Sequence, residues 1–243
     1  MAANDPQEAD LLRLLDLQRE DSEIRRLTER KASLPEAARL AELNERLEEL
    51  GADLAIARKQ QDEVEREQTR LEGEGDLLDA KIGREEQRLF SGAVGTPKEL
   101  SSLQAEVDML KRKKASLEDD LLEVMVQKDS AATTTERLQA EHEELEREAT
   151  SLAAVVNELT AEIDARLVEH SGARTRIAAA VSEDLLTLYE RIREQKHGVG
   201  AAALENGTCS GCHTKLPARE VERLKVERGL QRCDNCRRIL VVA

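Results

Sequence analysis

The sequence predicts an all-α fold, a long antiparallel helical hairpin paired as a coiled coil, followed by a small C-terminal domain. Of its 243 residues, 36% are charged and only 1% are aromatic, so a core has to be built from Leu, Val, Ile and Ala. Glycine and proline are sparse before the C-terminal fifth, and the abundant Leu, Ala, Glu, Lys, Arg and Gln favour helix. Disorder is the alternative for so charged a chain, but the apolar residues recur at a fixed period, which disorder does not require.

Heptad spacing runs through two long stretches. Alternate steps of three and four residues from Leu40 to Leu89 visit fifteen positions, of which eleven are apolar. The same steps from Leu100 to Ile163 visit nineteen positions, of which fifteen are apolar. An apolar seam of this kind, with Glu, Arg, Lys and Gln between its members, is typical of a coiled coil.

A turn joins the two stretches. The segment FSGAVGTPKEL, residues 90–100, cannot continue a helix and predicts a turn near residues 91–97. Pro97 suits the first turn of the second helix, because its fixed φ is already helical. Thr96 and Glu99 have the spacing of a capping box, so we expect Thr96 to be the N-cap.

The turn also predicts which seam positions face each other. Helices joined by a short loop fold back on one another, so positions pair when their numbers sum to about 189. Leu71 then meets Leu117, and Gln61 meets Lys128 in a polar layer that helps to fix the register. We interpret His142 as an ordinary seam residue.

Two further interruptions are predicted in the helices. The segment ASLPEAARL predicts a kink near residues 31–36, with Ser33 as the new N-cap. Gly172 weakens the second long helix, which then recovers and ends by Gly198. Residues 1–198 are therefore predicted to form the hairpin domain.

All four cysteines lie in the last 35 residues, in the segments TCSGCHTK and RCDNCRR. Cys209 and Cys212 form one C-x-x-C pair, Cys233 and Cys236 form the second, and 20 residues separate the pairs. Two residues between ligands let a tight turn point both sulfurs at one ion, and two such turns complete a tetrahedron. Residues 199–243 are therefore predicted to form a zinc ribbon that holds one structural Zn²⁺.

The segments around the cysteines predict a small sheet with a helical insertion. Asn206 and Gly207 form a hairpin-turn signal, and RRILVVA favours a strand. Between the two cysteine pairs, Pro217 and Gly229 mark the start and the end of a short helix.

Two redox-active pairs and an iron site are the alternatives to structural zinc. A thioredoxin-type pair needs a βαβ scaffold, which the sequence does not predict, and a rubredoxin-like iron site is disfavoured because the segment has no aromatic core. Four thiolates leave no open position for water, which disfavours catalytic zinc. His213 is therefore expected to be a neighbour of the site and not a ligand.

The order of these features resembles a family of bacterial coiled-coil proteins that end in a C4-type zinc ribbon. The resemblance covers essentially the whole chain, and its specific part is the segment from LYERIREQKHGVG onward together with the Lys98-Glu99-Leu100 turn. It implies that the four cysteines are the zinc ligands. Arg237 departs from the family, which usually has glycine after the last cysteine. The resemblance further implies a nucleic-acid-binding or transcription-associated regulatory role.

Charge is divided unevenly along the chain. Residues 204–243 hold eight Lys and Arg against five acids, a balance of +3, so the rest of the chain carries −17. Any contact with nucleic acid is expected at the ribbon and should be directed to phosphates. The candidate contact residues for a partner are Arg219, Arg223, Arg237 and Arg238. The acidic remainder suits another helix or a basic protein surface.

These features predict a non-enzymatic zinc-binding coiled-coil adaptor that uses its ribbon end to bind protein partners, with nucleic acid as a second class of partner. A purely structural coiled coil or oligomerisation protein is the alternative. An enzyme and a small-molecule substrate are disfavoured, because there is no phosphate-binding glycine loop and no nucleophile-base arrangement. No signal peptide or stretch of ~20 apolar residues is found, so we expect a cytoplasmic protein with no membrane partner.

Overall fold

Five helices and four short strands make up the regular structure of the described residues, which are 6–92, 95–227 and 229–242 of a computed structural model. The helices are α1 (Pro6–Ala32), α2 (Pro35–Phe90), α3 (Pro97–Ala178), α4 (Glu183–Gln195) and α5 (Ala218–Val226). They pack into two compact units, residues 1–38 with 153–243, and residues 39–152. The domain boundary predicted after residue 198 lies inside the first unit. No helix in the described ranges has both the length and the apolar character needed to cross a bilayer.

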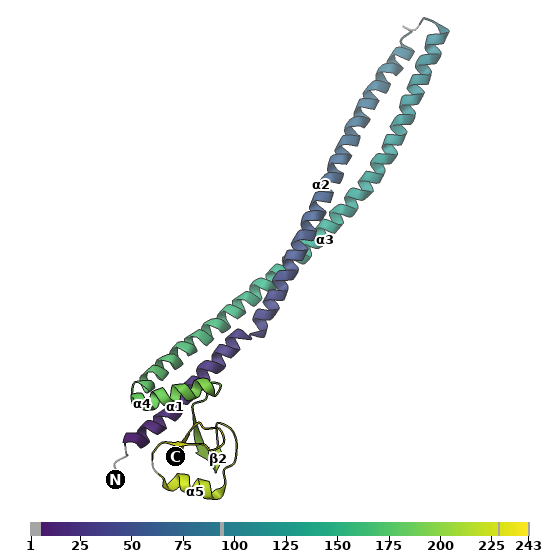
Figure 1. The fold of residues 1–243 in the computed structure, drawn as a ribbon. Coiled ribbons are helices and arrows are strands. Elements are labelled where there is room, and N and C mark those ends of the chain that lie inside the picture. The colour runs from purple at the N-terminus through teal and green to yellow at the C-terminus, as the bar shows by residue number, and fades with distance from the viewer. Residues whose placement is uncertain (1–5, 93–94, 228, 243) are drawn as a thin grey trace. The chain divides into compact units, whose positions relative to one another are not determined.

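Residues 39–152 form the predicted hairpin, in which α2 and α3 run side by side (Figure 1). Every seam position from Leu40 to Leu89 is buried or half-buried, as are eighteen of the nineteen from Leu100 to Ile163, including His142. The exception is Leu100, which is 46% exposed. The predicted seam is therefore buried along its length, and at its C-terminal end Ile163 packs with Leu27 of α1.

Ion pairs along the flanks of the hairpin confirm its antiparallel register. Lys81 Nζ lies 3.3 Å from Glu106 Oε1, and Arg39 Nη2 lies 2.6 Å from Glu148 Oε1. The numbers of each pair sum to about 189, as predicted for facing positions. All four side chains are largely exposed, so each pair adds little stability, about 0–1 kcal/mol.

The start of α3 and the break before α2 fall where the sequence predicts them. The Glu99 amide donates to Thr96 Oγ1 at 3.3 Å, and the Thr96 hydroxyl donates to the Glu99 carboxylate at 2.8 Å. Between α1 and α2, the Ser33 hydroxyl does not act as an N-cap. It donates instead to the Glu29 carbonyl at 2.8 Å and so closes the last turn of α1.

The sequence predicts only a weak point at Gly172 and a helix that then continues to Gly198, whereas the structure has a break after Ala178. α3 continues through Gly172 and ends at Ala178, because one glycine costs a helix only about 1 kcal/mol. The chain breaks between α3 and α4, where two side chains of α1 bind its backbone. Asp10 accepts from the Ser182 amide at 3.2 Å, and Arg13 donates to the Ala180 carbonyl at 3.2 Å.

The C-terminal segment forms a four-stranded sheet covered by α5. The strands are β1 (Ala201–Glu205), β2 (Thr208–Cys209), β3 (Gln231–Arg232) and β4 (Ile239–Val241), in the order β2-β1-β4-β3. β1 is parallel to β4 and antiparallel to β2. Asn206 and Gly207 both have positive φ, 51° and 78°, as the predicted tight hairpin turn requires.

The two central strands of this sheet separate two cores. One face carries Ala201, Ile239 and Val241, which pack against apolar residues of α1 and α4. From those helices come Leu11, Leu14, Leu17, Tyr189 and Ile192. The other face packs on α5 and the cysteines, through Ala202, Leu240, Leu216, Leu224, Cys209 and Cys233. This alternation is the period of two expected of a strand, and it places the N-terminal helix directly against the ribbon.

Candidate metal centre

The two C-x-x-C segments form two equivalent turns. The Cys209 amide donates to the Thr214 carbonyl at 3.1 Å, and the Cys233 amide donates to the Arg238 carbonyl at 3.0 Å. In each turn the residue after the second cysteine donates its amide to the first cysteine's carbonyl at 2.8 Å. That residue is His213 in one turn and Arg237 in the other, with φ of 57° and 63°.

This left-handed conformation explains the departure noted at Arg237. Glycine adopts positive φ without strain, whereas a residue with a Cβ loses roughly 1 kcal/mol there. Arg237 therefore keeps the backbone path that glycine would take, at a cost in stability. His213 has the same strain in the first turn, which no sequence pattern indicates.

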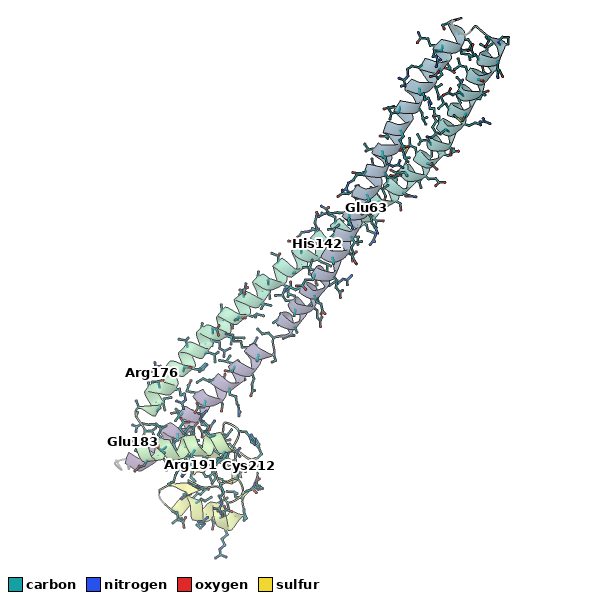
Figure 2. The ribbon with its side chains drawn as sticks, turned by 45° about the horizontal axis from the view of Figure 1, so that its top comes forward. Glu63, His142, Arg176, Glu183, Arg191 and Cys212 are labelled. Carbon is teal, nitrogen blue, oxygen red and sulfur yellow. The ribbon has the colours of Figure 1, made fainter. Side chains whose placement is uncertain are left out.

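The four sulfurs converge on one point. All lie within 4.8 Å of one another, with 3.9 Å between Cys209 Sγ and Cys236 Sγ and between Cys212 Sγ and Cys233 Sγ. A tetrahedral zinc with Zn–S bonds of about 2.3 Å holds its sulfurs about 3.8 Å apart, so these side chains fit that ion. Figure 2 labels Cys212 within this part of the molecule. His213 is exposed and is not one of the converging side chains.

The pKa values of three of the thiols are shifted, and not all in the same direction. Burial raises the pKa of Cys209 to about 12 and also raises that of Cys233. Burial opposes ionisation of Cys212 as well, but hydrogen bonds from Thr214 and Asn235 outweigh it and lower the pKa to about 6. Asn235 Nδ2 lies 3.6 Å from Cys212 Sγ and donates to Thr214 Oγ1 at 2.8 Å. Asn235 and Thr214 thus form a hydrogen-bonded shell behind one ligand.

The four candidate contact arginines have different surroundings. Arg219 is exposed and makes no hydrogen bond or ion pair with any residue that the structure describes. Arg237 has 69% of its side chain exposed, with Asp234 at the limit of ion-pair distance, 4.0 Å. Arg223 is half exposed, and its ion pairs with Glu227 and Asp234 measure 3.2 and 3.7 Å.

Arg238 is an internal anchor of the ribbon. It is half-buried, and it donates from Nε to the Val199 carbonyl at 3.0 Å and from Nη2 to the Lys196 carbonyl at 3.1 Å. These carbonyls lie just beyond the end of α4, where a cation is favoured. Arg238 therefore ties the second cysteine turn to α4 and is poorly placed to contact a partner.

A buried polar network joining α1, α3, α4 and the residue before β1 was not predicted. The Tyr189 hydroxyl is fully buried and donates to Asp21 Oδ2 at 2.6 Å, and Arg174 Nε donates to Asp21 Oδ1 at 2.7 Å. Gln18 Oε1 accepts from the Gly200 amide at 2.7 Å. Burial, and then the bond to Asp21, raise the pKa of Tyr189, so the phenol stays neutral. The one sequence feature that points to this network is that Tyr189 is the chain's single tyrosine.

The fold and the site together define a coiled-coil hairpin protein that ends in a C4 zinc ribbon with one structural Zn²⁺. Residues 17–197 match the CT398-like coiled coil hairpin domain, and residues 208–240 match the C4-type zinc ribbon domain. The chain belongs to the CT398-like coiled-coil hairpin family. Neither matched domain is a catalytic one.

Relatives and solved structures agree with this assignment. An uncharacterized protein of Mycobacterium tuberculosis, Rv2229c, is 31% identical over 233 residues, which cover 94% of this chain and 93% of that protein. A structure from Mycobacterium smegmatis has a TM-score of 0.81 at 26% identity, covering 96% of this chain and 98% of that one. CT398 from Chlamydia trachomatis shares the fold, with a TM-score of 0.69 at 19% identity and coverage of 98% and 99%.

Proposed function

We propose that this protein is a non-enzymatic adaptor whose zinc ribbon, packed with α1 and α4, presents a partner-binding surface. The observation that supports the proposal is that the ribbon packs directly against the helices. One face of its sheet packs on α1 and α4, and the backbone at Gly200 is bonded to Gln18 of α1. Zinc therefore shapes a surface to which both the ribbon and the helices contribute.

Exposed cations of the ribbon support binding to an acidic partner surface. Residues 1–38 and 153–243 together hold 22 acidic and 20 basic residues, so the unit is close to neutral, while residues 39–152 carry −12. Within it, Arg219 and Arg237 are exposed cations without strong ion pairs. An acidic protein surface is favoured over nucleic acid, because the ribbon has no aromatic side chain on which a base could stack.

The test is partner recovery by a charge-reversed ribbon. Full-length, zinc-loaded protein carrying Arg219→Glu, Arg223→Glu and Arg237→Glu is compared with the parent in pull-downs from the native cell, with and without nuclease. Arg238 is left unchanged because it anchors the ribbon. The matched control reverses three exposed cations of the other unit, with Arg84→Glu, Arg112→Glu and Lys113→Glu.

We expect the ribbon variant to lose a nuclease-resistant protein partner that the control variant retains. Zinc content and helicity must be equal in all three proteins. Loss of the partner on nuclease treatment of the parent points instead to nucleic acid as the bridge. Equal recovery by both variants contradicts the proposal, and recovery of the same chain alone favours a structural coiled coil.

A further inference from the structure

The middle of the hairpin seam lacks large apolar side chains. On α2, the four seam positions between Leu54 and Leu71 hold no leucine or isoleucine, and neither do the four seam positions between Leu121 and Leu138 of α3. They are Ala57, Gln61, Val64 and Gln68 on α2, and Val124, Lys128, Ala131 and Thr135 on α3. Three facing layers therefore lack a leucine on both helices: Ala57 with Ala131, Gln61 with Lys128, and Val64 with Val124. Leucine or isoleucine normally fills most such layers, so two helices alone leave this stretch underfilled.

A groove of about 650 Å³ opens between α2 and α3 at this stretch. Its apolar lining comes from Ala57, Val64, Val124, Val126 and Ala131. Val126 is 70% exposed, and Leu122, one turn away on the same face of α3, is 60% exposed. The apolar lining thus continues onto the open surface of α3. All of these residues belong to the unit of residues 39–152.

The charge around the groove is negative. Glu63 and Glu67 line it, and none of the described residues that line it is a lysine or an arginine. Figure 2 labels Glu63 on α2, where that helix runs beside α3. Among the residues that the structure describes, each glutamate has an ion pair only within its own helix, and the pair of Glu63 with Lys59 is long, 3.7 Å. The whole unit has 29 acidic and 17 basic residues, a net charge of −12.

We propose that this groove docks an amphipathic, basic α-helix of a partner protein. Apolar side chains at i, i+3 or i+4, and i+7 of that helix fill the underfilled layers beside Val64 and Val124, which makes the coiled coil locally three-stranded. Lysines or arginines on its flanks face Glu63 and Glu67. A second copy of this chain is a poorer occupant, because two units of −12 repel each other. The groove and the ribbon lie in different compact units, so neither proposal depends on the other.

The probe is a synthetic helix bound to the full-length, zinc-loaded protein. A fluorescein-labelled 21-residue peptide with leucines in a heptad seam and lysines on its flanks is titrated by fluorescence anisotropy. Two comparison peptides carry glutamate in place of lysine, or the same residues with the leucines out of register. We expect the basic seam peptide to bind at least tenfold more tightly than either. Equal affinity for the out-of-register peptide would mean binding by charge alone and overturn the proposal.

A variant that fills the groove distinguishes a loss of peptide docking from a loss of folding. In the variant Ala57→Leu with Ala131→Leu, a large apolar layer closes the groove, so peptide affinity should fall at least tenfold while the thermal midpoint is unchanged or higher. The pair Glu63→Gln with Glu67→Gln should weaken binding severalfold. Its matched control, Glu45→Gln with Glu49→Gln, removes the same charge at the same spacing on exposed positions of α2 and should not.

Two results would overturn the assignment of the groove. One is unchanged peptide binding by the filled variant. The other is a dimer of the parent in light scattering that the filled variant does not form, because the groove would then belong to a second copy.

Discussion

Replacing Gly200 with alanine should destabilise the unit in which the ribbon packs on α1 and α4. A Cβ at this position would lie 2.8 Å from two ring carbons of Tyr189 and 2.8 Å from the Tyr189 carbonyl oxygen. Carbon atoms in contact ordinarily lie about 3.5–4.0 Å apart, so the neighbours would have to move by about 0.7 Å or more.

Neither neighbour of Gly200 is free to move. The Tyr189 ring is fully buried and its hydroxyl is bound to Asp21, while the Gly200 amide is bound to Gln18. Overpacking a core costs about 1–3 kcal/mol, and the two fixed neighbours place Gly200→Ala toward the upper end, at about 2–3 kcal/mol.

Tyrosine fluorescence measures this loss locally, because Tyr189 is the only tyrosine and the chain has no tryptophan. In urea titrations, the free energy of unfolding from this signal should fall by about 2–3 kcal/mol. The matched control is Gly73→Ala, where a Cβ meets nothing within 4 Å. Gly73→Ala should leave the free energy of unfolding measured by tyrosine fluorescence unchanged, and it should raise the stability of α2 by about 1 kcal/mol. A tyrosine transition of Gly200→Ala within about 0.5 kcal/mol of the parent would refute the packing argument.

Three further outcomes are expected at the metal centre. Elemental analysis should find one zinc per chain, reduced by Cys233→Ser, and full zinc in that variant would contradict the ligand set. Asn235→Ala should lower zinc affinity by about tenfold in competition with a chelator, because it removes the hydrogen bond behind Cys212, and an unchanged affinity would exclude that role. Arg237→Gly and His213→Gly should each stabilise the ribbon by roughly 0.5–1 kcal/mol against urea, because both relieve positive φ, and a loss of stability would contradict the strain.

The hairpin and the ligand set could be predicted because their signals are local. A heptad period indicates which side chains share a helix face, and a C-x-x-C spacing indicates which share a turn. Neither depends on residues that are distant in the sequence. The position of the break after α3 could not be predicted in this way. The broken segment is bound by Asp10 and Arg13, which lie about 170 residues earlier in the chain, and Gly172 alone is too weak a signal to break the helix.

The packing of the ribbon on α1 and α4 could not be predicted from the sequence for a related reason. Gln18 and Asp21 look like ordinary polar residues of a surface helix, because the partners that bury them, Tyr189 and Gly200, are distant in sequence. Arg238 was grouped with the exposed cations because charged residues usually lie at the surface. Its two partners, the carbonyls of Lys196 and Val199, follow the end of α4, and only the fold brings them beside the second cysteine turn.

The central claim, that zinc shapes a ribbon built into the helices beside it, is tested most directly by amide hydrogen exchange of the whole chain with and without a zinc chelator. Removing zinc should speed exchange in the ribbon and also in α1 around Leu14 and Leu17, because the sheet that covers them is lost. Exchange within residues 39–152 should stay as it was, since that unit has its own seam. Unchanged protection of α1 when the ribbon has opened would contradict the account.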